Sequence, residues 1–595
     1  MRPKNMKNAT FKTQLLLAIV VAATLFLAPA AFAAAPGVSG TTFNLTAREA
    51  YLNQPDGEAV YSWGYGCVNT TGLTFLPAAI SGAACPTMQV PGPTMIVTEG
   101  QTITVNLTNN LPPAVGDTSI LFPGFNVSTS CTSTTTPAGQ QGLLTCEAAP
   151  GATVTYTFIA SAPGTHAYYS GTQGDLQIEM GLYGAVIVLP QTIPANCTSG
   201  YHALNATAQS HWGESDFRLT NATGGKGAAY DHPGSCYDRE YLFQWAEMDH
   251  RIHRQAEAEV RATTASGVCL VGGVVTPTNP GCSLSVQTEP YHPAYFLING
   301  RSMPDLMDPN YASEYPHQPY NGNPHMHPGE LTLIRTIGQG RWEHPFHEHA
   351  NHVRILARDA NLELSSNTTA VTYTSGLSTD AGVSAQGLAG LLMFNTDTTP
   401  GESFDGIFYY TGRGLNWDPY GHHAPLPGTT AGTPQADIYG DVLATLPCTP
   451  DVNGYNSSAP TAVNFMEWCQ DHDKPIQVAP FGDVTGGGPA TFPDPNVFTN
   501  GPWYSGTPYF GPDANLRAGT PQCVQNALIG STTNYTNCTN LNPSNVQANP
   551  PNERGWAFMW HSHNEREITT NNVFPGGMLM MMLVDSREFN IDESL

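Results

Sequence analysis

Two pairs of histidines with i, i+2 spacing constrain the fold of this chain more than any other feature. His347 and His349 lie in His344-Pro345-Phe346-His347-Glu348-His349, and His561 and His563 lie in Trp560-His561-Ser562-His563. Their apolar and aromatic neighbours are typical of β-strands, in which alternate side chains share a face. Two such strands side by side would bring these imidazoles together, with His344 as a fifth nitrogen donor. The pattern predicts a transition-metal site, since imidazole binds copper, zinc, iron and nickel; unrelated polar loop residues are the alternative.

Further segments match a known pattern around these histidines. Val90-Pro91-Gly92-Pro93-Thr94 and Asn109-Asn110-Leu111-Pro112 precede the first site region, and His344, His347 and His349 form an intact His-Pro-x-His-x-His motif. In these segments the chain resembles the multicopper oxidase superfamily, whose members are built from cupredoxin domains and carry four histidine motifs. The resemblance implies an all-β fold of tandem cupredoxin-like Greek-key sandwiches and copper as the cofactor.

The other three motifs depart from the family pattern. Leu121-Phe122-Pro123-Gly124 stands in place of the first motif, and Tyr169 and Gly171 occupy the ligand positions of the second. In the fourth motif, Ser562 stands where the family has its copper-binding cysteine, and Glu567 stands where it has a later histidine. A hydroxyl cannot replace the thiolate of a blue copper site. The resemblance therefore implies a degenerate member in which only His344 remains of the blue site.

Four histidines remain of the family's three-copper cluster: His347, His349, His561 and His563. They predict one mononuclear site, with copper first and zinc second. The alternative is a relic, in which the imidazoles hydrogen-bond to one another and to Glu348, Glu565 and Glu567 without a metal. These acidic residues could also orient the imidazoles or serve as ligands.

Two further groups of residues are weaker candidates for soft-metal binding. His317, His325 and His327, with Met326, lie in a proline-flanked turn ahead of the third motif and could recruit copper. Met578, Met580 and Met582 would share one face of a strand, and we expect that face to belong to the protein core.

The beginning of the chain is typical of a secretion signal. Four basic residues precede an apolar run over 15–28, and Ala31-Phe32-Ala33 follows as a small-residue cleavage site. We expect residues 1–33 to be removed, with an uncleaved anchor as the alternative, although the run is short for a membrane span. No later segment is long and apolar enough to span a membrane. The expected location is therefore extracytoplasmic: secreted, cell-surface or periplasmic.

Cysteine content agrees with export. The twelve cysteines fall into neighbouring couples, and an even number at short spacings in an exported chain predicts disulfides, although the connectivity does not follow from sequence. No thiol would then remain for a metal. The couples are Cys67 with Cys85, Cys131 with Cys146, Cys197 with Cys236, Cys269 with Cys282, Cys448 with Cys469, and Cys523 with Cys538.

The chain is strongly acidic, with 22 basic and 47 acidic residues and a formal net charge of −25. Removal of residues 1–33 would take away basic residues only and make the charge more negative. Such a charge disfavours nucleic acid and anionic lipid as partners and favours solubility or the attraction of cations.

Strand-like runs and turn clusters suggest two domains. We expect a first cupredoxin-like domain at 41–190, a linker at 191–238, and a second domain at 239–595. A stretch rich in Gly, Pro and Asn at about 412–551 reads as a loop-rich insertion into the second domain. The alternative is a third domain split around that stretch.

Three functions fit these observations. The first is an exported protein that binds copper or another transition metal through the residual histidines, without four-copper oxidase chemistry. The second is a copper-dependent oxidoreductase that uses a mononuclear copper to oxidise a metal ion or a small organic molecule. The third is an extracellular filament or surface-layer subunit. A metal ion is the expected partner, and a homo-oligomer would be compatible with all three.

Overall fold

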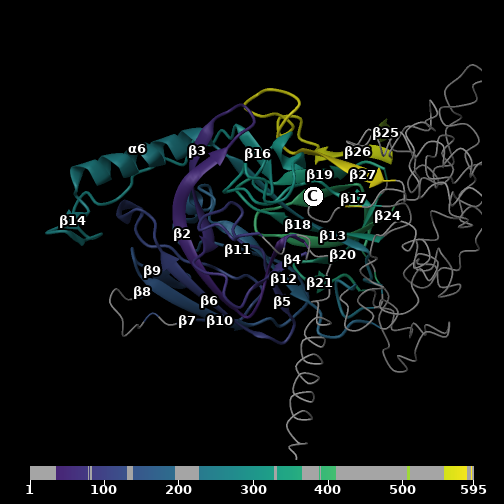
Figure 1. The fold of residues 1–595 in the computed structure, drawn as a ribbon, viewed down its shortest axis with the longest axis horizontal. Coiled ribbons are helices and arrows are strands. Elements are labelled where there is room, and N and C mark those ends of the chain that lie inside the picture. The colour runs from purple at the N-terminus through teal and green to yellow at the C-terminus, as the bar shows by residue number, and fades with distance from the viewer. Residues whose placement is uncertain are drawn as a thin grey trace, which may run out of the picture.

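The computed structural model describes residues 35–194, 227–364, 388–409, 506–509, 555–585 and 591, apart from 78–79, 81–82, 130, 132–138, 233, 327–330, 351 and 389. The secretion signal predicted at 1–33 and most of the insertion predicted at 412–551 lie outside these residues. Within them, strands dominate and form two packed pairs of sheets (Figure 1). The predicted all-β fold of tandem cupredoxin-like sandwiches is confirmed.

The first sandwich has two five-stranded sheets. Its core contains Val105 and Tyr156, which are fully buried. Residues of β6 alternate between buried and partly exposed, as expected for a strand with one face on a core. One sheet has the order β11 (Gly164–Tyr169), β12 (Tyr183–Leu189), β5 (Met95–Thr98), β1 (Gly37–Ser39) and β4 (Thr74–Leu76). The other has the order β3 (Ala59–Cys67), β2 (Thr42–Asn53), β6 (Thr102–Asn109), β10 (Thr153–Ile159) and β7 (Ser128–Thr129).

The second sandwich also has two sheets, and the segment nearest the C-terminus belongs to one of them (Figure 1). One of them, here called the inner sheet, contains β16 (Tyr295–Ile298), β13 (Arg239–Met248), β18 (Leu331–Gly338), β24 (Ser403–Tyr409), β20 (Val353–Arg358) and β21 (Asn361–Leu362), with β22 (Leu392–Met393) paired to β20. The other, here called the outer sheet, contains β17 (His325–Met326), β27 (Leu579–Asp585), β26 (Gly555–Ser562), β19 (His344–Glu348) and β23 (Asn395–Thr398), with β25 (Gly506–Tyr509) paired to β26.

Aromatic and methionine side chains fill the space between the inner and outer sheets. Trp245 of β13 packs with its ring centroid 4.7 Å from that of Phe346 of β19, and Trp560 of β26 packs against Phe346 at 5.9 Å. Met578, Met580 and Met582 are fully buried in this core, as predicted from their alternation. Phe346 of β19 and Phe558 and Trp560 of β26 therefore face this core, and the other side of both strands faces outward.

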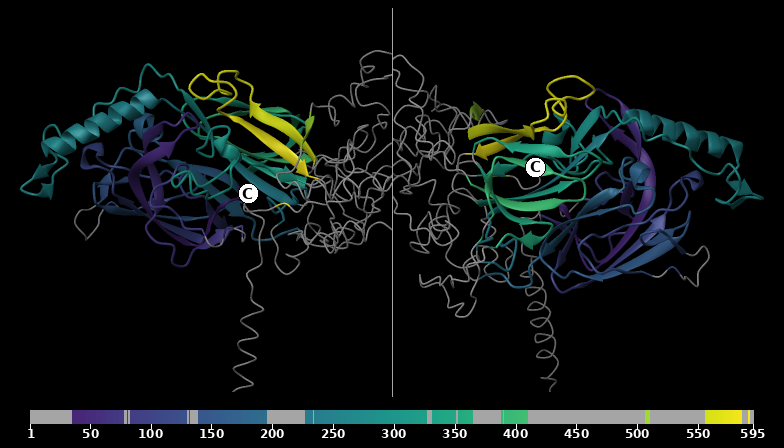
Figure 2. Two further views of the ribbon diagram at one scale, coloured as in Figure 1. Left: turned by 45° about the horizontal axis from the view of Figure 1, so that its top comes forward. Right: turned by 180° about the vertical axis from the view of Figure 1, so that it is seen from behind.

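A helix that sequence analysis did not predict projects from the first sandwich. Helix α6 (His250–Ser266) begins at Asp249, whose side chain accepts a hydrogen bond from the Arg251 amide, and ends at Gly267 in the left-handed conformation. Its buried face contains Ile252, Ala256 and Val260, and Figure 2 shows the helix at one end of the molecule. Short elements complete the fold: α2 (Gly174–Gln177), η2 (Pro113–Val115), η3 (Asp305–Met307), and the hairpins β8 (Gly139–Gln141) with β9 (Cys146–Ala148) and β14 (Leu270–Val271) with β15 (Val274–Val275).

A buried ionic cluster joins the two sandwiches. Arg335 of β18 is fully buried; its Nε contacts Glu240, and its Nη1 lies 3.4 Å from Oδ1 of Asp405. Thr165 of β11, in the first sandwich, donates to the same Asp405 oxygen at 2.6 Å and accepts from Arg335 at 3.0 Å. Thr165 of the first sandwich is therefore hydrogen-bonded to a buried ion-pair cluster of the second.

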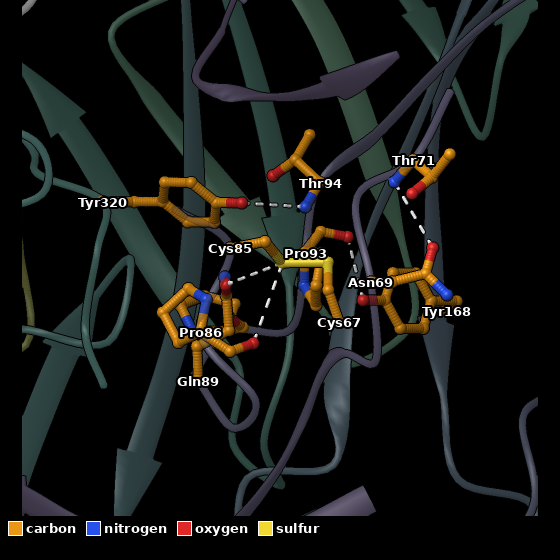
Figure 3. Close-up of a disulfide and its surroundings, with 11 residues drawn as sticks. Cys67, Asn69, Thr71, Cys85, Pro86, Gln89, Pro93, Thr94, Tyr168 and Tyr320 are labelled. Atoms are coloured by element: carbon orange, nitrogen blue, oxygen red, sulfur yellow. Dashed lines mark hydrogen bonds between the residues drawn. A yellow bond between two sulfur atoms is a disulfide. The ribbon is translucent and has the colours of Figure 1, made fainter. Parts of the chain in front are cut away.

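A second link between the sandwiches lies beside a disulfide. The amide of Thr94 donates to the Tyr320 hydroxyl of the second half at 3.0 Å, and Tyr168 donates to the Pro93 carbonyl at 2.9 Å (Figure 3). The Cys67–Cys85 disulfide lies directly beside these contacts (Figure 3). The segment at 93–94 is thus held from both sides.

Three of the predicted cysteine couples are disulfides: Cys67–Cys85, Cys131–Cys146 and Cys269–Cys282. The other three couples each include at least one cysteine outside the described residues. Among the residues that the structure describes, no helix combines the length and the apolar character needed to cross a bilayer.

Candidate metal centre

The two histidine strings lie on neighbouring antiparallel strands of the outer sheet. His347 of β19 is directly opposite His561 of β26, and Phe346 is opposite Ser562. Because side chains alternate along a strand, Phe346 and Trp560 point into the core, and His347 and His561 point to the outer face. Because of their i, i+2 spacing, His349 and His563 also point to the outer face.

Three of these imidazoles form a compact group. One ring nitrogen from each of His347, His349 and His561 lies within 4.8 Å of the other two, the spacing of ligands around one metal ion. The Nε2 atoms of His349 and His561 are 3.3 Å apart. Nδ1 of His347 lies 2.6 Å from the Phe394 carbonyl, which leaves Nε2 of that ring for a metal. We refer to His347, His349 and His561 as the histidine triad.

His563 lies beside the triad. Its ring centroid is 4.8 Å from that of His347, and 54% of its side chain is exposed. Its Nδ1 is 3.9 Å from a carboxylate oxygen of Glu565. The exposed ring is therefore placed at the solvent side of the group, as a fourth donor rather than as part of the compact three.

The surroundings of the triad favour the neutral form of its imidazoles. Burial, reinforced by the neighbouring His349, lowers the pKa of His347 to about 4. Burial also lowers the pKa of His561. Since a metal binds the neutral imidazole, these shifts remove the competition from protons at neutral pH.

His344 lies on the opposite face of β19 and does not join the triad. Both of its nitrogens contact buried carboxylates: Nε2 is 2.9 Å from Oε2 of Glu247, and Nδ1 is 2.9 Å from Oε2 of Glu567. Burial disfavours the charged ring, but the two carboxylates outweigh it and raise the pKa of His344 to about 9. His344 is therefore an imidazolium in a buried ion-pair cluster with Glu247 and Glu567.

The three acidic residues singled out from the sequence have different surroundings. Glu348 is fully buried on the core face of β19, where burial raises its pKa well above the ordinary value. Glu565 is exposed next to His563, and Glu567 belongs to the His344 cluster. Only Glu565 is close to an outward-facing imidazole.

The residues that replace the first two family motifs lie in the first sandwich. Leu121 and Tyr169 pair through backbone hydrogen bonds of 2.7 and 3.3 Å, and a side chain at Gly171 would meet that of Leu121. His166 is buried, with its ring centroid 4.3 Å from that of Phe125, and burial lowers its pKa. These positions supply no imidazole to the triad.

The weaker histidine group is divided between separate environments. Nδ1 of His317 lies 2.8 Å from the Met88 carbonyl, and His325 and Met326 form β17. Met326 is part of the core of the second sandwich. His327 lies outside the described residues. In the part of the chain that the structure describes, the histidine triad is the group of three with metal-ligand spacing.

Comparisons with known proteins agree with this architecture. A family model for multicopper oxidase matches residues 83–193, in the first sandwich. An L-ascorbate oxidase from Brassica rapa subsp. pekinensis is 39% identical over 100 residues, which are 17% of this chain and 16% of the relative. Residues 83–193 of the first sandwich are therefore similar to multicopper oxidases.

Two further similarities complete the comparison. Laccase-3 from Botryotinia fuckeliana is 35% identical over 101 residues, which are 16% of this chain and 20% of the relative. A blue copper oxidase from Nitrosomonas europaea is similar over 63% of this chain and 77% of its own, with 16% identity and a TM-score of 0.35. The matched segments thus span a fifth or less of the length of the two sequence relatives.

By their sequence resemblance, His344, Ser562 and Glu567 occupy the positions of blue copper ligands, but these residues do not fit a copper ion. Ser562 donates to Oε2 of Glu567, the same oxygen that His344 Nδ1 contacts at 2.9 Å. A carboxylate oxygen therefore lies at the point where the side chains at 344 and 562 converge. This group contains no thiolate, and both nitrogens of His344 are engaged by carboxylates, so it lacks the ligands of a blue copper site.

Sequence reasoning missed Glu247 as the second partner of His344. It lies 97 residues before His344, on β13 of the inner sheet, and no local motif connects the two positions. Tyr291 extends the cluster, with its hydroxyl 3.0 Å from Glu247 and 2.6 Å from Glu179. Such long-range polar contacts are a property of the packed sheets and have no signal in the sequence.

Proposed function

We propose that this protein is an exported, multicopper-oxidase-like protein that binds one copper ion through the histidine triad and lacks four-copper oxidase chemistry. The observation that carries the proposal is the convergence of three imidazole nitrogens within 4.8 Å on one outward sheet face. The even number of cysteines and the three described disulfides support an oxidising compartment outside the cytoplasm.

The donor set is chemically suited to copper, with zinc as the alternative metal. Neutral imidazoles from adjacent strands are good ligands for both metals, and His563 provides a fourth donor on the solvent side. Relatives in the superfamily are named as an ascorbate oxidase and a laccase, which favours copper over zinc.

The lost ligands argue against four-copper chemistry in this chain. Tyr169, Gly171 and the segment at 121–124 supply no imidazole, and Ser562 supplies no thiolate. The family's three-copper cluster needs eight histidines, and four of those positions retain one. We infer that the remaining group binds a single ion.

Partial exposure of the triad favours a second function, a mononuclear copper oxidoreductase. His347 and His349 are partly exposed and His563 is exposed, so a small reductant could reach the group. Three protein ligands with an open position are the pattern of catalytic metal sites, whereas structural sites are closed. Bound copper would supply one-electron chemistry, and the chain's own residues would hold it, keep their imidazoles neutral, and leave one side accessible.

The decisive experiment measures metal per chain. We would compare the wild-type protein with His347→Ala/His561→Ala, using elemental analysis after copper loading and an electron paramagnetic resonance spectrum. The proposal predicts about one copper per chain with a nitrogen-coordinated, non-blue spectrum, and its loss in the double variant. His292→Ala removes an exposed histidine away from the triad and should keep the metal.

Two outcomes would overturn this proposal or restrict it. Equal copper in the wild type and the double variant would exclude the triad as the site. No retained metal in the wild type would mean that the imidazoles are relics. Oxidase turnover that disappears in the double variant and survives in His292→Ala would establish the second function.

A further inference from the structure

The outer face of β26 and β27 carries sulfur ligands as well as imidazoles. Met559 lies two residues before His561 on β26, so the two side chains share the outer face. Met581 of β27 is directly opposite Met559. Both methionines are partly exposed, whereas Met578, Met580 and Met582 are fully buried in the core.

Strand register places these methionines next to the histidine triad. His349 follows the last residue of β19, and its amide donates to the Met559 carbonyl at 3.3 Å. His349, Met559 and Met581 therefore form one row across three strands, next to the row of His347, His561 and Leu579. Directly opposed residues in antiparallel strands have Cβ atoms about 4.5–5.5 Å apart, which is within reach of long side chains.

The chemistry of this row differs from that of the triad. Thioether sulfur is a soft ligand that selects Cu(I), and methionine has a flexible, unbranched side chain that can adjust to a metal. Met559 and Met581 are less buried than the core methionines, so a copper ion can reach their sulfur atoms from the outer face.

We propose that His349, Met559 and Met581 form a mixed imidazole and thioether site that binds monovalent copper beside the histidine triad. The inference rests on the proposed copper binding, because His349 belongs to both groups. It deepens that function by naming the oxidation state: the protein accepts copper as Cu(I) on the methionine side of the face. No redox step is needed for this binding.

The test is an anaerobic titration with Cu(I) in competition with a colorimetric Cu(I) chelator. Met559→Leu/Met581→Leu removes both sulfur atoms at similar side-chain volume. We expect its Kd for Cu(I) to rise at least about tenfold, which corresponds to about 1.4 kcal/mol. The X-ray absorption spectrum of the Cu(I)-loaded wild type should show sulfur scattering that the double variant lacks.

Met580→Leu is the matched control, because it lies on the same strand and faces the core. It should keep the Cu(I) affinity of the wild type even if it lowers the stability. Unchanged Cu(I) affinity in the double variant, or no sulfur scattering in the wild type, would overturn the inference.

A Cu(II) titration separates this inference from the proposed function. The methionine variant should bind Cu(II) as the wild type does, whereas His347→Ala/His561→Ala should lose it. If the methionine variant binds Cu(I) as tightly as the wild type does, and the triad still binds Cu(II), only the methionine site is refuted. Retention of Cu(II) by the histidine variant would refute the triad.

Discussion

His344 Nδ1 and Ser562 Oγ both hydrogen-bond to the same atom, Oε2 of Glu567. In the family, the positions of His344 and Ser562 hold a copper ion between an imidazole and a thiolate. In this chain a carboxylate oxygen lies at their meeting point, and Glu247 engages the other nitrogen of the ring. A buried ion-pair cluster therefore stands at these positions, and the cluster has measurable consequences.

We predict that folding stability depends on the charge of His344. Its pKa of about 9 in the folded protein exceeds the value of about 6.5 expected in the unfolded chain. A raised pKa contributes stability that is complete below the unfolded value and is lost as the pH rises through the folded value. The free energy of unfolding, measured with urea, should therefore fall between about pH 6.5 and pH 9, on the order of 3 kcal/mol at most. His344→Gln should flatten this dependence, and a slope that persists in that variant would contradict the prediction.

We predict that two substitutions create a blue copper centre. Ser562→Cys supplies the missing thiolate, and Glu567→His removes the carboxylate that engages His344 Nδ1 and adds a second imidazole. Two histidines and one cysteine are the equatorial ligands of blue copper sites. Copper loading should give an intense visible band in this variant and none in the wild type. Ser562→Ala/Glu567→His, which lacks the thiolate, is the control; an equally intense band in that control would show that the colour has another origin.

We predict that the histidine triad keeps its metal in mild acid. The pKa of His347 is lowered to about 4, and that of His561 is also lowered. If a ligand imidazole had the ordinary pKa of about 6.5, the affinity for the metal would fall about tenfold from pH 7.5 to pH 5.5. Protonation of His347 and His561 should lower the metal affinity far less than that. Competition titrations with a chelator at both values would measure the change, and a loss of about a hundredfold would show that both imidazoles titrate normally.

We predict a large loss of stability when Arg335 is removed. Arg335→Met leaves Glu240 and Asp405 buried without their cation, and breaking a buried pair in this way costs about 3–5 kcal/mol. Arg254→Ala breaks an exposed pair with Glu58 and should cost less than about 1 kcal/mol. Denaturant unfolding of both variants measures the difference, and equal losses would mean that the cluster between the sandwiches contributes little.

Much of the fold follows from local sequence patterns. The alternation of Ile103, Val105 and Leu107 places one face of β6 on a core, and the alternation of Met578, Met580 and Met582 does the same near the C-terminus. Helix α6 had a comparable signal in Ile252, Ala256 and Val260, whose spacing of four residues is helical. It was missed because the surrounding chain reads as strands and turns.

In the candidate site, too, the sequence predicts some residues and not others. The i, i+2 spacing was enough to place His347 with His349 and His561 with His563, because it depends only on strand alternation. His344 was expected in the same group, yet its odd spacing from His347 places it on the other face of β19. Its partner Glu247 could not be predicted, since that contact depends on how the inner sheet packs on the outer one.

Strand β19 separates two chemistries that lie only three residues apart. His344 faces a buried, charge-compensated interior, and His347 faces the outside. Residues 562 and 567 lie on the inner side, so substitutions there replace no outer imidazole. The strand therefore acts as a partition between a buried ion-pair cluster and an outward histidine group, so that substitutions on one face leave the side chains of the other face in place.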